Sequence, residues 1–381
     1  MKDALIIGAG FAGATLARKL AEGGYKVRMV ETRANIAGNM FDYTDENGII
    51  VQQFGPHIFH TNLTHVFDFL NTFAAFMPYE HKVVGSIDGK MIPIPFNLQS
   101  IDLIYDAEMA DRLKTKLIDR YGLGKKIPIT ELKREQDPEL HALADFIYHK
   151  VFRNYTMKQW GMLPEELDPE VMTRVPVHIS YDCRYFQDEI QQMPEGGFTP
   201  LFAKMLDHDN IEIQCNQDAK DCLRFAEANE EILVDGQVFD GVVIFTGCVD
   251  ELFEQKHGAL PYRSIDFQFE THSVRQYQEA AVVNYPNEHA FTRITEFKHF
   301  TGPVDAAQTT IMYEFSELNG PLPCYPIPHA ENESIVKRYQ REAAKYKNLH
   351  LIGRLAEYKY YNMDQVVHHA LQLAERILQD D

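Results

Sequence analysis

The chain has 381 residues, of which 45% are hydrophobic and 12% aromatic, enough for two or three domains with real cores. Its 37 basic and 56 acidic residues give a formal charge of −19, which disfavours a general nucleic-acid binder because such proteins need a basic face. The five cysteines show no CxxC spacing and no apolar stretch is long enough to span a bilayer, so we expect a cytoplasmic protein with no metal centre and no membrane.

The N-terminal stretch ALIIGAGFAGATLARKLAEGGYKVRMVE has the form of a dinucleotide-binding βαβ unit. Its pattern predicts a buried parallel strand at Ala4–Ile7, a helix at Ala14–Ala21 and a second strand at Lys26–Val30. The sequence G-x-G-x-x-G lies between the first strand and the helix, and an acid ends the second strand. Because all these parts agree, we predict that the unit binds a dinucleotide.

Each residue of this fingerprint has a physical role. Gly8 permits the tight turn, Gly10 lets the backbone approach a pyrophosphate, and Gly13 lets the helix pack closely on the strand. The pyrophosphate is expected at the helix N-terminus, where free N–H groups favour an anion. Glu31 follows Gly13 by 31 − 13 = 18 residues and can accept a hydrogen bond from a ribose hydroxyl.

The residues after the second strand favour FAD over NAD. An acid, a basic residue two positions later at Arg33 and a glycine turn at Gly38 resemble the extension found in FAD-binding Rossmann proteins. Such folds return late in the chain with a strand, a glycine and a helix, and Leu349–Leu355 followed by a helix from about Met363 has that form. The stretch YKYYNMDQ between them is then expected at the carboxyl edge of the sheet, where ligands bind.

The remaining elements follow in chain order. We predict a helix at Asn62–Phe76, a hairpin in KVVGSIDGKMIPIPF with Asp88-Gly89 at its turn, helices from about Asp102 to Lys150 with a break around Gly122 to Pro128, a hairpin at Glu231–Asp240 with Asp235-Gly236 at its turn, a buried strand at Val242–Gly247, and an antiparallel sheet between Tyr262 and Tyr325.

The predicted fold is α/β, with a discontinuous Rossmann-like FAD-binding domain, a helical-bundle insertion and an antiparallel β-sheet domain. Residues 1–78, 196–258 and 333–381 are assigned to the first domain, residues 99–172 to the helical domain with a mobile loop near 165–177, and residues 79–98, 173–195 and 259–332 to the sheet domain.

Several motifs, in order along the chain, resemble those of the bacterial UDP-galactopyranose mutases. They are GPHIFHT, NYTMKQWG, PYRSIDF, FTRITEFKHF, CYPIP and GRLAEYKYYNMDQ. The resemblance runs from residue 4 to the last helix, and the second and last of these motifs are long and specific.

The resemblance implies an isomerase that interconverts UDP-galactopyranose and UDP-galactofuranose by ring contraction with no net redox change. Reduced FAD would be the cofactor, with its N5 attacking the anomeric carbon while UDP leaves. Relatives of this fold act on dTDP-fucopyranose or UDP-N-acetylgalactosamine, so these substrates stay open. The residues also leave open a redox flavoenzyme of the amine-oxidase type and a non-catalytic nucleotide-sugar sensor. The family also suggests a homodimer that serves cell-surface polysaccharide synthesis.

The resemblance also implies roles for individual residues. Arg174 and Arg293 match the two arginines that hold the diphosphate, and together with His60 they are the expected catalytic residues. Phe152, Tyr155, Thr156 and Trp160 match the uridine-binding loop, with core packing as the alternative for Phe152. The expected sugar- and phosphate-facing residues are Tyr185, Asn284, Glu314, Tyr325, Arg354, Tyr360 and Asn362, whereas Tyr358 and Tyr361 either line the site or point into the core.

The flavin-facing residues implied by the motifs come from both ends of the chain. They are Gly8, Gly10, Phe11, Ala12, Gly13, Glu31, Thr32, Arg33, Gly38, Asn39, His57, Ile58, Gly247, Gly353, Arg354, Asn362 and Met363.

Five positions depart from the family pattern and leave the sugar open. Asn362 stands where Asp is usual, Phe297 replaces a His, and Cys324 replaces a Tyr. Ala37 replaces the first Gly of a Gly-Gly pair, and His81 lies where many members have Asn near the sugar. Loss of a polar partner would suit a 6-deoxy sugar.

Overall fold

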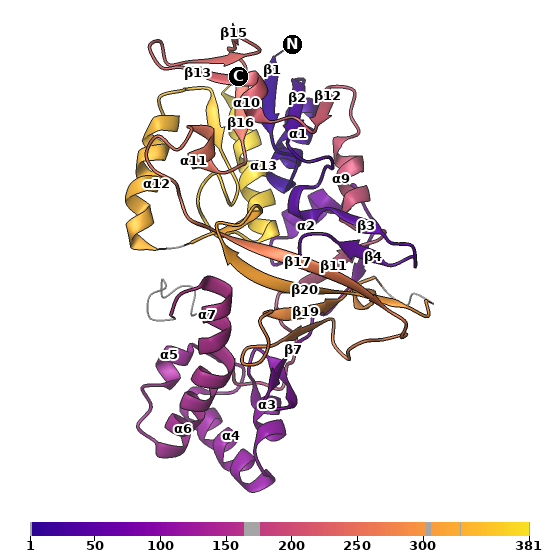
Figure 1. The fold of residues 1–381 in the computed structure, drawn as a ribbon, viewed down its shortest axis with the longest axis vertical. Helices are drawn as coiled ribbons and strands as arrows, with labels where there is room; N and C mark the ends of the chain where they lie inside the picture. The colour runs from indigo at the N-terminus through magenta and orange to yellow at the C-terminus, as the bar shows by residue number, and fades with distance from the viewer. Residues whose placement is uncertain (1, 164–175, 302–305, 328, 381) are drawn as a thin grey trace.

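The computed structural model describes residues 2–163, 176–301, 306–327 and 329–380. Figure 1 shows three regions along the long axis of the molecule: a parallel sheet with its helices at the top, long strands across the middle, and a group of helices at the bottom. Both termini lie at the top. The division of the chain into domains at the residues given above stays a prediction.

A five-stranded parallel sheet forms the upper region. Its order is β12 (Ile211–Cys215), β2 (Lys26–Glu31), β1 (Asp3–Ile7), β16 (Val242–Phe245) and β22 (Leu349–Leu351), and every neighbouring pair is parallel. Strands β1 and β16, at the centre, are apolar apart from the exposed Asp3, because both faces of the sheet are covered. Helix α1 (Phe11–Glu22) packs against the last helix, α13 (Met363–Gln379), on one face. The α/β class and the Rossmann-like βαβ unit are confirmed.

A seven-stranded sheet crosses the middle of the molecule. Its order is β21 (Pro323–Pro326), β17 (Tyr262–His272), β20 (Thr309–Leu318), β19 (Arg293–Glu296), β18 (Val282–Asn284), β7 (Val83–Ile87) and β8 (Lys90–Ile94). The pairs are antiparallel except β18 with β7, which is parallel and joins strands about 200 residues apart in the chain. The predicted hairpin β7–β8 has Asp88 and Gly89 at its turn, both with positive φ.

The lower region is helical. It contains α3 (Leu98–Ile104), α4 (Ala107–Tyr121), α5 (Ile129–Leu132), α6 (Pro138–Ile147), the π-helical turn Tyr148–Arg153 and α7 (Asn154–Trp160). Asp106 and Asp137 cap α4 and α6 by accepting backbone N–H groups, as their sequence positions favour. The chain leaves α4 at Gly122, which has positive φ, so the expected break in the helical pattern is present there.

Smaller elements complete the fold. These are β3 (Asp42–Thr44) with β4 (Ile50–Gln52); β5 (Phe59–Thr61), β11 (Ile190–Pro194) and β6 (Phe76–Pro78); β9 (Lys126–Ile127) with β10 (Val177–His178); β13 (Leu223–Ala226), β14 (Glu231–Val234) and β15 (Gln237–Val238); helices α9 (Phe198–Leu206), α10 (Ala219–Cys222), α11 (Val249–Leu252) and α12 (Ala330–Ala343); and 3-10 turns at Gly38–Met40 and Phe297–His299.

One predicted helix is too long. The apolar pattern of Asn62–Phe76 continues beyond the helix, but α2 covers only Thr64–Asn71, and Phe76 begins strand β6. Phe76 packs against Phe59 and Phe67 with ring centroids 5.9 and 5.3 Å apart, so its burial comes from the β5–β11–β6 sheet and not from a helix face.

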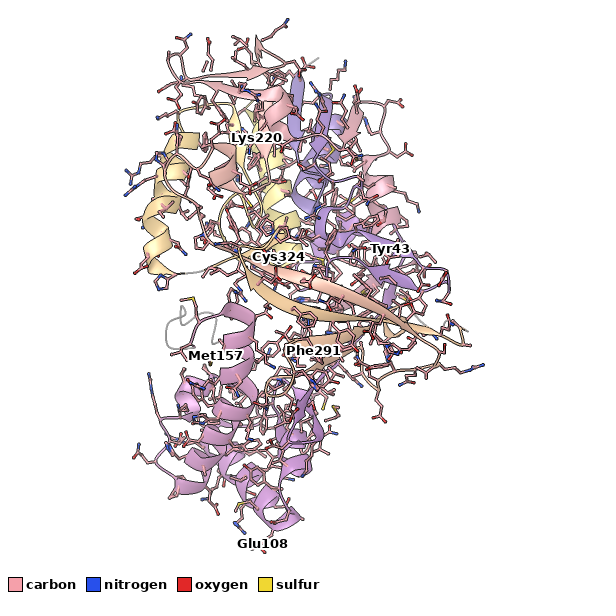
Figure 2. The ribbon with its side chains drawn as sticks, viewed as in Figure 1. Tyr43, Glu108, Met157, Lys220, Phe291 and Cys324 are labelled. Carbon is pink, nitrogen blue, oxygen red and sulfur yellow. The ribbon has the colours of Figure 1, made fainter. Side chains whose placement is uncertain are left out.

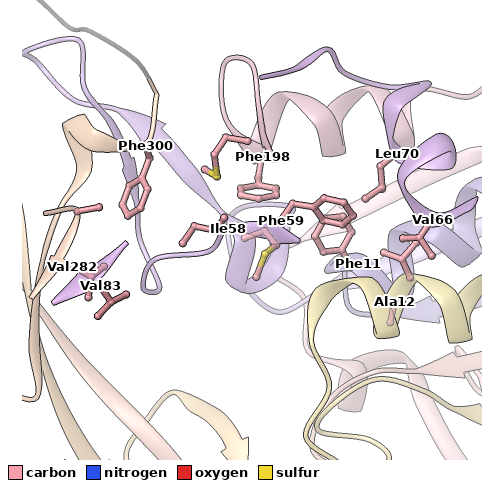
Figure 3. Close-up of a cluster of buried hydrophobic side chains, with 14 of the residues drawn as sticks. Phe11, Ala12, Ile58, Phe59, Val66, Leu70, Val83, Phe198, Val282 and Phe300 are labelled. Atoms are coloured by element: carbon pink, nitrogen blue, oxygen red, sulfur yellow. The ribbon is translucent and has the colours of Figure 1, made fainter. Parts of the chain in front are cut away.

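One apolar core joins the upper and middle regions. Figure 3 shows Phe11 and Phe198 of the upper region in the same cluster as Val83 and Val282 of the central sheet and Phe300, which follows the turn Phe297–His299. Phe11 lies with its ring centroid 4.6 Å from that of Phe202. Because protein cores are close-packed, this shared core fixes the two regions relative to each other.

Candidate active site

A cavity of about 860 Å³ opens at the carboxyl ends of β1, β2, β16 and β22. Most of the residues that the sequence assigned to the flavin line it: Gly8, Gly10, Phe11, Ala12, Glu31, Thr32, Arg33, Gly38, Asn39, His57, Gly247, Gly353, Arg354 and Met363. Gly13, Ile58 and Asn362 do not line it. Gly13 packs behind the turn, Ile58 is in the core, and Asn362 is exposed at the start of α13.

Gly8 at the cavity and Gly13 behind it leave no room for side chains. A Cβ on Gly8 would lie 2.1 Å from Thr246 Oγ1, and one on Gly13 would lie 1.9 Å from the Gly8 carbonyl oxygen. Gly10 precedes α1 and offers no side chain as a cap, so the first backbone N–H groups of the helix stay available to a ligand. This backbone cradle fits the pyrophosphate of a dinucleotide.

The acid at the end of β2 is held in place by backbone donors. Glu31 Oε2 accepts from the Ala9 N–H at 2.8 Å and Oε1 from the Arg33 N–H at 2.9 Å. A carboxylate has about four acceptor positions, so each oxygen can still accept a ribose hydroxyl. Glu31 therefore fits the ribose of the cofactor.

Arg33 offers an unused donor at the same end of the cavity. Its Nη2 donates to Asn39 Oδ1 at 3.0 Å and its guanidinium lies 4.4 Å from the Phe54 ring centroid. Among the described residues, nothing accepts from its buried Nη1. Burial lowers the pKa of Arg33, as expected for a cation that awaits an anionic partner. The donors of this cavity therefore fit a dinucleotide such as FAD.

His57 is uncharged in this cavity. Its Nδ1 lies 2.8 Å from the Gly55 carbonyl oxygen, which can only accept, so Nδ1 carries the proton and Nε2 is left as an acceptor. Burial, together with the positive charge of Arg354, lowers the pKa of His57 to about 3. The ring therefore keeps this tautomer at neutral pH.

A second group of predicted site residues, those expected to face the sugar and the phosphates, is centred on a buried ion pair. Arg293 on β19 and Glu314 on β20 face each other across a strand pair, with Nε and Oε1 2.7 Å apart, and the Glu314 side chain is only 1% exposed. Burial by itself lowers the pKa of Arg293, but the carboxylate of Glu314 outweighs it and the net shift is upward. Arg293 is thus held as a fixed cation in one orientation.

Three buried tyrosines lie close enough to this cation for its charge to act on their hydroxyls. Burial raises the pKa of Tyr155, Tyr185 and Tyr325, although the charge of Arg293 acts in the opposite direction on each. All three therefore keep their protons and can donate hydrogen bonds. A guanidinium with neutral hydroxyl donors around it is suited to a diphosphate.

Arg354 connects the two parts of the site. It lines the flavin cavity, and its guanidinium carbon lies 5.2 Å from the Tyr325 ring centroid and 4.8 Å from that of Tyr360. Tyr325 and Tyr360 are stacked, with centroids 5.5 Å apart and an interplanar angle of 13°, and Trp160 of α7 lies 6.5 Å from Tyr360. Figure 2 shows Cys324, next to Tyr325, near the centre of the view above Met157 of α7.

Other predicted site residues lie at the edge of this cluster or outside it. Phe152 is buried in the apolar core, which supports a packing role for it, and Thr156 is also buried. Asn284 pairs with Arg293 across the β18–β19 ladder, and its buried Oδ1 has no partner among the described residues. Arg174 lies outside the described residues.

His60 is held away from the flavin cavity. Its Nδ1 donates to Asp188 Oδ2 at 2.8 Å, and its ring stacks on Phe186 with centroids 3.6 Å apart. The bond to His60 lowers the pKa of Asp188 despite burial. The sequence contains no signal for this pairing, because Asp188 is 128 residues away. His60 stays a prediction as a catalytic residue.

The stretch YKYYNMDQ divides between site and core. Tyr360 belongs to the aromatic stack described above. Tyr358 packs on Tyr262 and donates to the Pro261 carbonyl, and Tyr361 donates to Glu357 Oε1 at 3.1 Å. Tyr358 is therefore a core residue, and Tyr361 lies behind the site.

The departures from the family pattern have different consequences. Phe297 is fully buried between Phe269 and Phe300, so it is a packing residue and does not face the cavity. Ala37 adopts a φ of +78°, where glycine is favoured. Cys324 lines the flavin cavity, and burial raises the pKa of its thiol to about 11.

His81 is buried beside the cluster around Arg293. Its Nδ1 lies 3.3 Å from the Tyr79 hydroxyl, and its ring is surrounded by Tyr185, Phe186 and Phe300. Burial, with a contribution from Arg293, lowers its pKa to about 3. His81 therefore contributes a neutral ring to this wall.

The sequence did not point to every residue of the cavity. Thr246 fills the space next to Gly8. Lys220, Arg224 and Lys256 also line the cavity, but in the sequence they look like ordinary surface cations and did not indicate a site. In the described part of the chain no three potential ligands gather as a metal site, and no helix there could cross a bilayer.

The family comparisons agree with the motifs. A family model described as UDP-galactopyranose mutase matches residues 150–360, and one described as an NAD(P)-binding Rossmann-like domain matches residues 6–73. A dTDP-fucopyranose mutase of Escherichia coli is 34% identical over the full length of both chains. A probable UDP-galactopyranose mutase of Klebsiella pneumoniae is 33% identical and covers 99% of this chain and 95% of that protein.

Solved structures with low identity share the fold. A crystal structure of reduced UDP-galactopyranose mutase superposes with a TM-score of 0.73 at 16% identity, covering 100% of this chain and 96% of that one. A putative protoporphyrinogen oxidase from Exiguobacterium gives a TM-score of 0.64 at 13% identity, covering 100% and 99%. The fold is thus shared with a putative oxidase, whereas the two relatives named above, matched over almost their full length, are mutases. The chain belongs to the UDP-galactopyranose mutase family of FAD-dependent isomerases.

Proposed function

We propose that this protein interconverts UDP-galactopyranose and UDP-galactofuranose with reduced FAD as cofactor. One observation carries the proposal: the Arg293 cluster, with its three tyrosine hydroxyls, adjoins the glycine-lined cavity through Arg354. A nucleotide sugar bound by its diphosphate at this cluster would present its anomeric carbon toward the cofactor. When bound, reduced FAD supplies a nucleophile, N5, for that carbon.

The protein's own contribution is binding and orientation. Since the chain carries a net charge of −19, a diphosphate needs cations placed locally. Arg293 is held by Glu314, so little side-chain entropy is lost when it meets a phosphate. Arg174, outside the described residues, is proposed as the second diphosphate arginine on family resemblance.

The same cations argue against an amine substrate. One of the structures with this fold is a putrescine oxidase, with a TM-score of 0.59 at 12% identity. A cationic amine at the present site would meet Arg293 and Arg354, and like charges repel strongly where water is excluded. A redox flavoenzyme is therefore less well supported than the mutase.

A second substrate, dTDP-fucopyranose, is supported by the Escherichia coli relative, which is named a dTDP-fucopyranose mutase. The wall at His81, with Phe186 and Phe300 around it, is mainly aromatic and suits a sugar that lacks a hydroxyl at C6. The relative named for the UDP-sugar is almost equally similar, at 33% identity. Substrate choice therefore needs an assay.

The test is turnover of defined sugar nucleotides by the purified flavoprotein. UDP-galactofuranose and dTDP-fucofuranose are incubated separately, with and without dithionite, and the products are separated by chromatography. Conversion of UDP-galactofuranose to its pyranose only in the reduced state is the expected result. Conversion of only the fucose nucleotide would identify it as the substrate and leave the proposed reaction chemistry unchanged. Bound FAD with no conversion of either nucleotide would contradict the proposal.

The role of Arg174 is tested by Arg174→Ala. This variant should retain FAD yet lose most turnover, because the diphosphate would lose a bidentate partner. Arg338→Ala, a change of the same charge at an exposed position of α12, is the control and should remain active. Equal turnover of Arg174→Ala and the control would remove Arg174 from the site. A cytoplasmic location and a homodimer stay predictions.

A further inference from the structure

The loop Gly353–Tyr361 separates two cavities. Gly353 and Arg354 line the flavin cavity on one side. Glu357 and Tyr361 line a second cavity of about 450 Å³ on the other side, between β22 and α13. The loop therefore has one face on the site and one face behind it.

The Glu357 carboxylate closes this loop. Its Oε2 accepts from the Gly353 N–H at 2.9 Å, and its Oε1 accepts from the Tyr361 hydroxyl at 3.1 Å. The Glu357 N–H also donates to the Gly353 carbonyl at 3.0 Å. One side chain thus ties together the first and last residues of the loop.

The last residue of this loop also fixes Arg354. The Tyr361 carbonyl accepts from Arg354 Nη2 at 2.5 Å and from Nε at 3.1 Å, so two guanidinium nitrogens are fixed by one backbone oxygen. This orientation places the guanidinium over the Tyr325 and Tyr360 rings. If Tyr361 moves, the acceptor that orients Arg354 moves with it.

We propose that Glu357 is a positioning residue for the reaction, acting through Tyr361 on Arg354; this rests on the proposed function. Glu357 does not line the flavin cavity, and its carboxylate bonds go to Gly353 and Tyr361. Its effect is to hold the Tyr361 carbonyl where Arg354 needs it. Free Arg354 would have more orientations, and ordering it on substrate binding would cost affinity.

The experiment measures UDP binding and not only turnover. Trp160 is the only tryptophan of the chain and lies beside Tyr325 and Tyr360, so its emission reports directly on this stack. UDP is titrated into the holoenzyme of wild type, Glu357→Ala, Tyr361→Phe and the double variant. Glu375→Ala, at an exposed position of α13, is the charge-matched control.

We expect Glu357→Ala to keep its FAD and to weaken UDP binding about tenfold, the size of one hydrogen bond to a charged group. KM should rise by more than kcat falls. Tyr361→Phe should show a smaller effect in the same direction. The double variant should be no worse than Glu357→Ala, because both changes break the same link.

The remaining outcomes would each overturn the proposal. A lower melting temperature with unchanged UDP affinity in both single variants would leave Glu357 a merely structural residue. Additive losses in the double variant would show that the two side chains act separately. The titration needs no turnover, so it remains decisive for the link if wild type acts on none of the tested sugar nucleotides.

Discussion

The cofactor cavity and the substrate cluster are built by different means. The cofactor cavity lies at strand ends, and its glycine-rich cradle comes from the N-terminal βαβ unit, within residues 7–40. The substrate cluster is made of side chains from α7, β19, β20, β21 and the 353–361 loop, which the fold gathers from distant parts of the chain. A backbone site is set by local glycines, whereas a side-chain site depends on long-range packing.

This difference predicts how each region fails. Substitution in the backbone cradle should abolish binding because atoms cannot overlap. Substitution in the side-chain cluster should give graded losses, which compensating changes can partly reverse. The following variants test this contrast, from the largest expected effect to the smallest.

The largest effect is expected at Gly13. A Cβ there would lie 1.9 Å from the Gly8 carbonyl oxygen, a distance that forces α1 away from β1. Gly13→Ala should purify without FAD, as measured by visible absorbance. Gly48→Ala is the control: it strains a backbone with a φ of +77°, but no atom lies within 4 Å of its Cβ, so this variant should keep FAD. A yellow Gly13→Ala protein would show that the cradle tolerates displacement.

Arg293→Ala should have a smaller effect than Gly13→Ala, but it should lower both the stability of the protein and its affinity for UDP. It leaves the Glu314 carboxylate buried without its partner, so the free energy of unfolding should fall by about 3–5 kcal/mol in urea titrations. Arg293→Ala combined with Glu314→Gln removes that buried charge and should recover part of the stability. UDP affinity should stay low in both variants. Recovery of UDP binding in the double variant would show that Arg293 is only structural.

His81 gives a pH dependence of stability. Its pKa is about 3 in the folded protein against an ordinary value of 6.5, so its contribution to stability is complete above pH 6.5 and is lost as the pH falls toward 3. Between pH 8 and pH 5 the free energy of unfolding should fall on the order of 2 kcal/mol further in wild type than in His81→Asn. Equal slopes in the two proteins would mean that His81 is hydrated.

The smallest effect is expected from Tyr360→Phe. The ring remains and can stack on Tyr325 as before, so only the hydroxyl is lost. UDP should bind about fivefold more weakly, the size of one neutral hydrogen bond. Tyr277→Phe, at an exposed tyrosine beside the central sheet, is the control and should bind UDP as wild type does. Equal affinity of both variants would place the Tyr360 hydroxyl outside the site.

The sequence predicted the cofactor region well for a physical reason. The close packing at Gly13 and the bonds of the acid Glu31 depend on neighbours within about thirty residues, and only the contact of Gly8 with Thr246 is distant. The short helix α2 was overestimated because Phe76 continues the apolar pattern although its burial comes from a strand pairing. The local sequence pattern carries no information about that strand pairing.

The residues of the substrate cluster could be predicted only from the family motifs. Nothing in local sequence says that Arg293 meets Glu314, or that Tyr325 stacks on Tyr360, because these contacts depend on sheet register and on loop closure. The bond between His60 and Asp188 and the link through Glu357 were missed for the same reason. Motif resemblance predicted Tyr360 as a site residue but left open whether Tyr358 and Tyr361 line the site or point into the core.

The position of β22 in the parallel sheet has a consequence for how the protein is made. Strand β22 and helix α13 follow all the other elements of the cavity in sequence, yet β22 pairs with β16 and α13 packs on α1. The growing chain on the ribosome therefore carries an incomplete cavity that lacks Gly353, Arg354 and Met363. Complete flavin binding must therefore follow the synthesis of β22 and α13, and the edge of β16 stays exposed until β22 pairs with it.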